Sequence, residues 1–400
     1  MRPPRVAALA SRRRGYRSLA FILAGTLAVG AYAVVVRIPD GSVPGWVLRA
    51  RRAAVLSSIE GQRAIRQARI QRGLPSGPAD RLQTGLVGIE SSPITTELGS
   101  AAAKRTSTDP VFAAAIVDML YRAGVGPGSI VAVGMTGSFP ALDLDTEVAV
   151  EAMGAVPLAI SSVGASQWGA NEVGLTWLDM EATLQRDGVI RNRSLAVAPG
   201  GTEIVTGSPE PEDELRRRLA AASGLPVVPN LSLADEVKYR MDLYDAAALA
   251  HGRTIAVFVN VGGSAADIGA GGAGEEIIPP GLSRPHWTTF EASRLGVVGR
   301  MALRGLPIVN LLDVARLAAR YDLAWDPPSS PSAQDLPAPP PDPIAVGVAL
   351  ALLLALVVTA HKVGLFRVPD WEMPGALRSR WRMPGSAAAS RSIEPAPRGS

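Results

Sequence analysis

The central part of the chain alternates short apolar runs with longer segments in which apolar residues recur at helical spacing. Runs of strand length occur at Ile130–Met135, Val156–Ser161, Ser194–Ala198, Pro226–Pro229, Ile255–Val261 and Pro307–Leu311. Helical patterns cover Pro110–Ala123, Thr146–Met153, Glu212–Ala222 and Leu233–Leu249. Continuous Val, Ile and Ala runs separated by helices are typical of parallel strands buried on both faces. Residues 85–325 are therefore predicted to form an α/β domain with a doubly wound, mostly parallel, Rossmann-like sheet.

Two longer apolar stretches lie outside this region, at Ser18–Val36 and Ile344–Ala360. They contain about 19 and about 17 uncharged residues, close to the length that spans a bilayer. Neither stretch carries the polar stripe that a helix packed on a soluble core normally shows. The sequence therefore predicts that two transmembrane helices flank the α/β domain.

The charges beside these stretches predict their orientation. Residues 1–17 are rich in arginine and contain no acid, and residues 361–400 are also basic. Because basic flanks stay in the cytoplasm, both tails are predicted to be cytoplasmic and the main domain extracytoplasmic. Ala31-Tyr32-Ala33 also fits a signal-peptidase site, but the apolar run continues to Val36, beyond the usual end of a cleavable signal. A retained membrane anchor is the favoured interpretation.

Composition excludes several kinds of site. The formal net charge is +4, yet the segment between the two apolar stretches holds about 27 Lys and Arg against about 33 Asp and Glu, so the positive excess lies in the tails. Nucleic-acid binding is therefore not expected, and the tails are suited to anionic lipid. The chain has no cysteine and three histidines, which excludes disulfides and thiolate sites. No metal or cofactor is predicted.

Two further segments connect the domain to its flanks. Residues 43–73 have a helical pattern with many arginines, which suits either a juxtamembrane stalk or an amphipathic helix packed on the domain. Residues 326–343 are rich in proline and are expected to form an extended spacer.

Three of the apolar runs end in turns of small polar residues: "MTGSFP" from Met135, "ISSVGASQWGAN" from Ile160 and "VNVGGSAADIG" from Val259. Such turns let backbone N–H groups approach an anion, and ligands of parallel sheets bind where the strands end. If the three strands share a sheet, the turns face one crevice; the strand order that decides this is not given by the sequence. The candidate ligand-binding residues are Thr136, Gly137, Ser138, Ser161, Ser162, Ser166, Asn171, Asn260, Gly262, Gly263 and Ser264, with Lys104 and Arg105 adding positive charge.

Catalytic candidates are fewer. Ser138 follows a strand, but its surroundings lack the G-x-S-x-G frame of a nucleophile elbow, and a Ser–Lys arrangement with Lys104 or Lys238 is no better supported. Asp179 and Glu181 are two residues apart, so they do not share a helix face, and a capping or solvated role is favoured over an acid/base or metal pair. Ser138, Asp179 and Glu181 remain secondary candidates for catalysis.

Several phrases resemble, in the same order, the poly-γ-glutamate system protein family of membrane-anchored bacterial proteins. They are "ITTELGSAAAKRTSTDP", "VAVGMTGSFPALD", "SSVGASQWGAN", "TWLDME" and "FVNVGG", followed by weaker likeness through "GLPIVNLLDVARLAARYDLAWDP". The likeness extends from about Ile94 to Gly263 and covers most of the predicted domain. It implies a place in the bacterial cell membrane, beside the poly-γ-glutamate synthase in capsule and cell-envelope biosynthesis, and brings no reaction and no catalytic residue.

Three functions follow as expectations. The first is a non-catalytic component of poly-γ-glutamate synthesis or export, whose domain binds the anionic polymer or the synthase subunits. The second is a γ-glutamyl hydrolase or transferase, with Ser138 or Thr136 as nucleophile and Asp179 or Glu181 as base. The third is a scaffold that contacts only protein partners. The mildly acidic domain disfavours broad capture of a polyanion, so polymer binding would have to be local.

Overall fold

The computed structural model describes residues 43–74, 76–200, 211–272, 278–285, 294–329 and 343–362, with the single residues Thr26 and Gly30. The chain divides into two compact units, Val43–Ala338 on one hand and Met1–Ser42 with Pro339–Ser400 on the other. The predicted segment Ser18–Val36 lies outside the described residues apart from those two positions. Among the helices that are described, none combines the length and the apolar character needed to cross a membrane.

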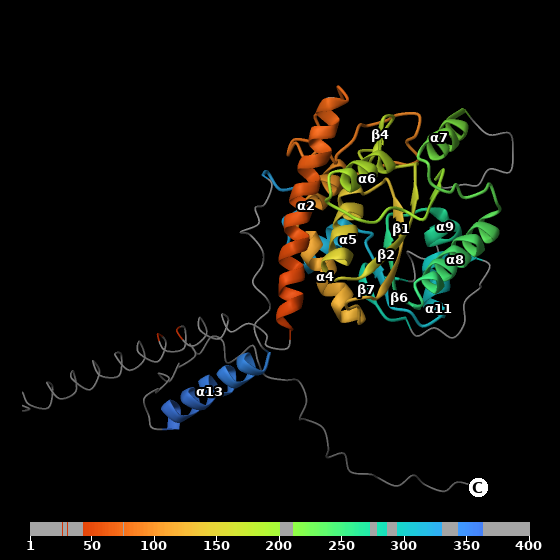
Figure 1. The fold of residues 1–400 in the computed structure, drawn as a ribbon. Coiled ribbons are helices and arrows are strands. Elements are labelled where there is room, and N and C mark those ends of the chain that lie inside the picture. Colours follow the sequence, from red (N-terminus) through yellow and green to blue (C-terminus); the bar gives the residue numbers. More distant parts are fainter. Residues whose placement is uncertain are drawn as a thin grey trace, which may run out of the picture. The chain divides into compact units, whose positions relative to one another are not determined.

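A six-stranded sheet forms the centre of the unit Val43–Ala338, in the order β5-β2-β1-β6-β8-β7 (Figure 1). The strands are β1 (Ile130–Thr136), β2 (Val156–Ser162), β5 (Ala196–Ala198), β6 (Ile255–Val261), β7 (Gly281–Ser283) and β8 (Ile308–Asn310). All neighbouring strands are parallel except β7, which pairs antiparallel with β8. The predicted mixed α/β fold with a mostly parallel sheet is therefore confirmed, and it is compatible with a Rossmann-like arrangement.

Two features of the sheet differ from the sequence prediction. The edge strand β7 was not predicted, because its first two residues end the stretch "GEEIIPPGL", which has the Pro and Gly content of a turn. The run Pro226–Pro229 was predicted as a strand, but it contributes only a single bridge between Val197 and Val227. A separate antiparallel pair, β3 (Asn171–Glu172) and β4 (Leu175–Thr176), lies outside the main sheet.

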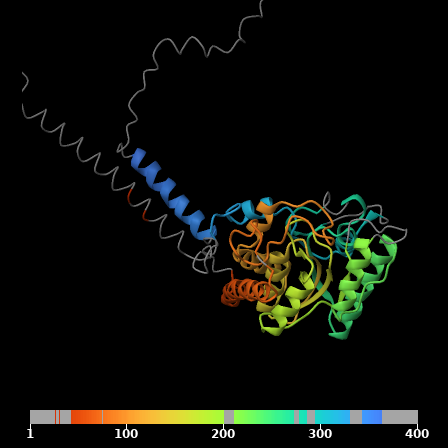
Figure 2. The same ribbon diagram turned by 90° about the horizontal axis from the view of Figure 1, so that it is seen from above.

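Helices cover both faces of the sheet. They are α2 (Gly45–Gln71), α3 (Ala101–Ser107), α4 (Val111–Ala123), α5 (Pro140–Ala152), α6 (Trp177–Arg186), α7 (Pro211–Ala222), α8 (Leu233–Ala250), α9 (Ala265–Ile268), α11 (Val297–Leu303) and α12 (Val314–Arg320), with a 3-10 turn at Ala270–Gly272; α13 (Pro343–Lys362) belongs to the other unit. Helices α2, α4 and α5 share a core on one face, and α8 and α11 share a core on the other. Figures 1 and 2 both place α2 and α8 on opposite sides of the sheet.

Strand β1 shows why its apolar run is continuous. Val131, Val133 and Met135 belong to the core under α2, α4 and α5, whereas Ile130 and Ala132 belong to the core under α8. Every residue of β1 is buried. A strand covered on both faces needs an apolar residue at each position, and this is the pattern from which the parallel sheet was predicted.

The helix expected over residues 43–73 is α2, and it packs against α4 and α5. Val47, Ala54 and Ile65 are fully buried on its inner side. Arg69 is also buried and donates to Glu172 at 2.6 Å through Nη1. Of the two interpretations of this segment, the structure shows the helix packed on the domain. The compact unit therefore begins at Val43, before the predicted start of the domain at residue 85.

Candidate ligand pocket

The strand order places a crevice between β1 and β6. From β1 the chain moves to β2 and then β5 on one side, whereas β6 and β8 lie on the other side of β1. Ligands of open parallel sheets bind at such a reversal, outside the carboxyl ends of the strands. Strand β1 ends at Thr136 and β6 ends at Val261, so the first and third small-residue turns border this crevice.

A cavity of about 920 Å³ opens at this point, which is within the roughly 300–1,000 Å³ usual for small-molecule sites. All three turns contribute to its lining, as does α3. The predicted residues that line it are Lys104, Thr136, Ser138, Ser162, Ser166, Gly263 and Ser264. The convergence that the sequence left open is therefore present in the structure.

Gly262 shows how closely the third turn approaches the first. Its backbone has φ +86, in the left-handed region that favours glycine. A Cβ at this position would overlap Oγ1 of Thr136. Any other residue at 262 would therefore push the two turns apart and change the width of the crevice.

Among the described residues that line this cavity, Lys104 is the one cation, and its side chain is almost completely buried. Its Nζ donates to Oγ of Ser166 at 2.9 Å and to the carbonyl oxygen of Ser138. The same Nζ lies 3.5 Å from the ring centroid of Phe139. Lys104 thus connects α3 to the first and second turns at once.

Burial lowers the pKa of Lys104 to about 7, while the nearby carboxyl groups of Asp143 and Glu97 act to raise it. A lysine in water has a pKa near 10.4. Removing the ammonium from water disfavours its charged form, and here that effect exceeds the attraction of the two acids. Lys104 therefore titrates near neutral pH, between a charged donor and a neutral amine.

Backbone and hydroxyl groups hold the first two turns together. The N–H of Ser166 donates to Oγ of Ser138 at 3.1 Å, and the N–H of Ser138 donates to Oγ1 of Thr136 at 3.3 Å. The N–H of Ala170 donates to the carbonyl oxygen of Gly137 at 2.7 Å. These bonds fix the hydroxyl groups of Ser138 and Ser166 on one wall of the cavity.

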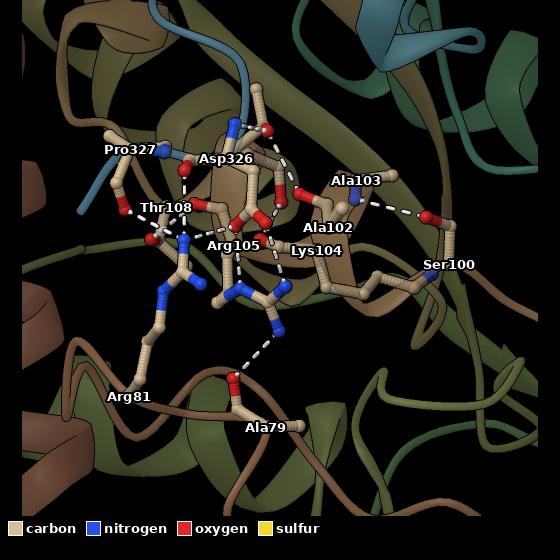
Figure 3. Close-up of polar contacts among 12 residues, drawn as sticks. Ala79, Arg81, Ser100, Ala102, Ala103, Lys104, Arg105, Thr108, Asp326 and Pro327 are labelled. Atoms are coloured by element: carbon tan, nitrogen blue, oxygen red, sulfur yellow. Dashed lines mark hydrogen bonds and ion pairs between the residues drawn. The ribbon is translucent and has the colours of Figure 1, made fainter.

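Arg105 lies outside the lining, although it adjoins Lys104 in sequence. Its Nε and Nη2 donate to the carboxylate of Asp326 at 2.6 and 2.9 Å. Arg81 donates to the same carboxylate at 2.7 Å, and the N–H of Asp326 donates to Oγ1 of Thr106. Figure 3 shows Lys104 and Arg105 leaving α3 in different directions. We call Arg81, Arg105, Thr106 and Asp326 the Asp326 cluster.

The other predicted ligand-binding residues serve the fold around the cavity. Asn171 donates to the carbonyl oxygen of Ile89 at 2.8 Å, and its Oδ1 accepts from the N–H of the same residue. Asn260 donates to the carbonyl oxygen of Gly262 and to Oδ1 of Asn310, each at 2.9 Å. Apart from Arg105, five predicted residues lie outside the lining: Gly137, Ser161, Asn171, Asn260 and Gly262.

The two predicted acids on α6 are held by structural hydrogen bonds. Oδ2 of Asp179 accepts from the N–H and hydroxyl of Thr176, which makes the capping box at the start of α6. Glu181 is fully buried and accepts from the N–H and hydroxyl of Ser194 at 2.8 and 2.6 Å. Neither side chain lines the cavity, so neither is placed to act on a ligand bound beside Ser138.

Helix α5 buries two carboxyl groups, Asp143 and Glu147, whose oxygens have no hydrogen-bond partner. Burial raises the pKa of both well above the ordinary range, and mutual repulsion with Glu181 adds to the effect. Within the described ranges, no group of three or more His, Cys, Asp or Glu side chains could hold a metal ion. These carboxyl groups are therefore stable in the protonated form.

Part of the cavity wall was not predicted. It comes from residues 96–100, from Ser232 and Leu233 at the start of α8, and from Ala270 and Gly271. Ser232 caps α8 and is followed by acids in the first turn, a sequence signal for a helix start but not for a ligand site. Residues 96–100 have no helix or strand pattern, so only the fold brings them to the crevice.

Fold and cavity together define an α/β protein with a pocket, lined in part by hydroxyl-bearing and small residues, at the carboxyl edge of a mostly parallel sheet. Comparison with protein-family models, with curated proteins and with solved structures finds no match for the chain.

Proposed function

We propose that the pocket binds a carboxylate-bearing segment of an anionic polymer, and that the protein is an accessory component of poly-γ-glutamate synthesis or export. The observation that supports this proposal is the convergence of three small-residue turns and the buried Lys104 on one cavity. Poly-γ-glutamate carries one α-carboxylate per residue, so a short segment presents repeated anions. The polymer itself is proposed on the sequence resemblance.

The charge distribution makes this binding local. Of the described residues that line the cavity, Lys104 is the cation when it is protonated, and Glu97 is the acidic residue. A cation in a poorly solvated site gives a stronger hydrogen bond to a carboxylate than it would in water. Hydroxyl groups of Thr136, Ser138 and Ser162 add neutral donors on the same walls. Recognition would therefore involve one or two carboxylates rather than the whole polyanion.

Membrane attachment is a further part of the proposal and rests on the sequence. The two apolar stretches and their basic flanks would anchor the protein in the bacterial cell membrane, with both tails cytoplasmic and the α/β unit extracytoplasmic. Cell fractionation with alkaline extraction tests this attachment directly. Release of the full chain into the soluble fraction would contradict it.

Polymer binding is tested with the purified full-length chain and poly-γ-glutamate of defined length, by co-elution from a sizing column and by titration. Lys104→Met should weaken binding by about 10- to 100-fold, because a charge-assisted hydrogen bond contributes about 1.5–3 kcal/mol. Lys238→Met is the matched control, since Lys238 is exposed and paired with Asp242 on α8. Equal affinity of wild type and Lys104→Met would contradict the proposed site.

A further inference from the structure

We propose that Lys104 and Ser166 form a catalytic pair in which Ser166 is the nucleophile and Lys104 the general base for cleavage of an amide bond. The choice of substrate, a γ-linked amide within the anionic polymer, rests on the proposed function. The pair itself rests on the geometry of the cavity wall. It differs from the serine and acids that the sequence suggested, because it combines residues from α3 and from the second turn.

The distance between the two groups suits proton transfer. Nζ of Lys104 lies 2.9 Å from Oγ of Ser166, inside the roughly 2.6–3.2 Å expected of a nucleophile and its base. Both residues line the cavity of about 920 Å³. A ligand in this cavity can therefore reach the hydroxyl group while the amine stays behind it.

Further contacts fix both partners. Nζ of Lys104 donates to the carbonyl oxygen of Ser138 and lies 3.5 Å from the ring centroid of Phe139. The N–H of Ser166 donates to Oγ of Ser138. A neutral amine that donates one proton to a carbonyl keeps its lone pair for the Ser166 hydroxyl. Ser138 thus becomes a positioning residue for the pair, because its carbonyl and its hydroxyl each hold one member.

The charges around Lys104 are consistent with a neutral amine near pH 7. Burial lowers its pKa to about 7, so a substantial fraction is unprotonated at neutral pH. The carboxyl groups that face it are Asp143 on α5 and Glu97 before α3, and both favour the ammonium. Burial raises the pKa of Asp143 well above its ordinary range, so its carboxyl is largely uncharged and holds the ammonium only weakly.

The reaction balances without another reactant besides water. Oγ of Ser166 attacks the amide carbonyl carbon as its proton passes to Nζ of Lys104. The C–N bond then breaks, Lys104 returns the proton to the leaving nitrogen, and an ester with Ser166 remains. Water attacks the ester, gives its proton to Lys104, and the Ser166 oxygen leaves with a proton from Lys104. The products are one carboxylic acid and one amine.

Other hydroxyl groups of the cavity fit the nucleophile role less well. Ser264 caps α9 and donates to Oδ2 of Asp267 at 2.6 Å, so its proton is already directed to a carboxylate. Within the described part of the chain, Nζ of Lys104 forms no hydrogen bond with the hydroxyl group of Thr136 or Ser138, and its bond to Ser138 goes to the carbonyl oxygen. Their hydroxyl groups are instead the type of donor that stabilises a developing oxyanion.

The first test labels the full-length protein with a fluorophosphonate, which reacts covalently with activated serines, and locates the adduct by mass spectrometry. We expect one adduct on Ser166, with a labelling rate that rises from pH 6 to pH 8 around a midpoint near 7. Ser166→Ala should abolish labelling and Lys104→Met should slow it by about 100-fold or more. Lys104→Arg should stay slow, because a guanidinium remains protonated. Ser57→Ala on α2 is the control.

The second test incubates the same proteins with poly-γ-glutamate and follows both binding and chain length. Shortened chains with wild type and unchanged chains with Ser166→Ala support the catalytic pair. Binding without shortening and without an adduct overturns the pair and leaves the proposed function intact. An adduct on Ser166 without polymer binding supports the pair and overturns the proposed polymer. An adduct on Ser138 overturns the assignment of the nucleophile. Thermal unfolding of each variant confirms that the comparison is between folded proteins.

Discussion

Lys104 and Arg105 are neighbours in sequence, yet the structure places them in two opposite environments. Lys104 is buried among a carbonyl, a hydroxyl and an aromatic ring, and burial lowers its pKa to about 7. The Arg105 guanidinium forms two bonds with the Asp326 carboxylate, and these bonds raise its pKa. Successive helical residues point about 100° apart, so a single helix can supply one cation to a pocket and the next to an ion pair. A basic pair in a sequence is therefore not by itself a basic site.

The largest expected effect comes from bringing a side chain between the turns of the pocket. Gly262→Ala should lower the free energy of unfolding by about 3 kcal/mol, since it combines strain at positive φ with overlap against Thr136. Gly252→Ala is the matched control, because Gly252 also has positive φ but nothing within 4 Å of its added Cβ. Urea unfolding measures both. Equal losses in the two variants would show that the turns are not in close contact.

Replacing Lys104 or Arg105 with methionine, one at a time, distinguishes the role of the pocket from that of the Asp326 cluster. Arg105→Met should lower the free energy of unfolding by about 1–2 kcal/mol, because it removes charge-assisted bonds in a partly buried cluster. Polymer affinity should stay within a factor of three of wild type. Lys104→Met should show the reverse, a loss of about 10- to 100-fold in affinity with a change in stability within about 1 kcal/mol. Thermal unfolding measures the stability of both variants, and titration measures their affinity for the polymer. If both variants lost stability and affinity to the same extent, Lys104 and Arg105 would not have separate roles.

The carboxyl groups of Asp143 and Glu147 on α5 provide a third contrast, because they are buried like Lys104 but have no hydrogen-bond partner. Glu147→Met should raise the free energy of unfolding at pH 8 by about 1–2 kcal/mol, since an unpaired buried ionisable group is replaced by an apolar one of similar volume. Burial raises the pKa of Glu147, so folding favours its protonated form. The free energy of unfolding of the wild type should therefore fall as pH rises above the ordinary pKa of a glutamate, and that of Glu147→Met should fall less.

Unfolding in urea from pH 4 to pH 9 measures this difference. Glu60→Met, at an exposed position of α2, is the control. The same dependence on pH in wild type and Glu147→Met would contradict the expected protonation.

The smallest effect concerns the Asp326 cluster in acid. Hydrogen bonds from Arg105 are the main cause that lowers the pKa of Asp326, so this carboxyl contributes stability at neutral pH and loses it as pH falls below its ordinary range near 4. Wild type should exceed Asp326→Asn in stability by up to about 1 kcal/mol at pH 7. The two should converge toward pH 3, which urea unfolding at several pH values measures. A difference that is constant with pH would assign the role of Asp326 to geometry rather than charge.

The sequence predicted the parts of this molecule that depend on local pattern. Strands β1, β2 and β6 are buried on both faces, so their apolar runs were unambiguous. Strand β7 was missed because a three-residue edge strand carries almost no periodic signal. The turns after β1, β2 and β6 were also identified, because Gly and Ser interrupt an apolar run.

The relations between distant segments could not be predicted in the same way. Nothing in the sequence indicates that Lys104 contacts Ser166 or that Arg105 contacts Asp326, since 62 and 221 residues separate these partners. Asn171 and Asn260 have the composition of ligand-binding residues, yet their amides bond to the backbone and to other side chains of the fold. Such roles depend on the strand order, which only the three-dimensional fold provides.

The pairing of β1 with β6 also has a consequence for how the protein folds. Their paired residues, such as Ile130 and Ile255, lie far apart in sequence, and the strands β2 and β5 between them belong to the other half of the sheet. Until the chain beyond Val261 is available, β1 has one edge without a partner strand, a state that is prone to aggregate. The walls of the pocket come from both halves. The slow, long-range step that closes the sheet is therefore also the step that creates the pocket.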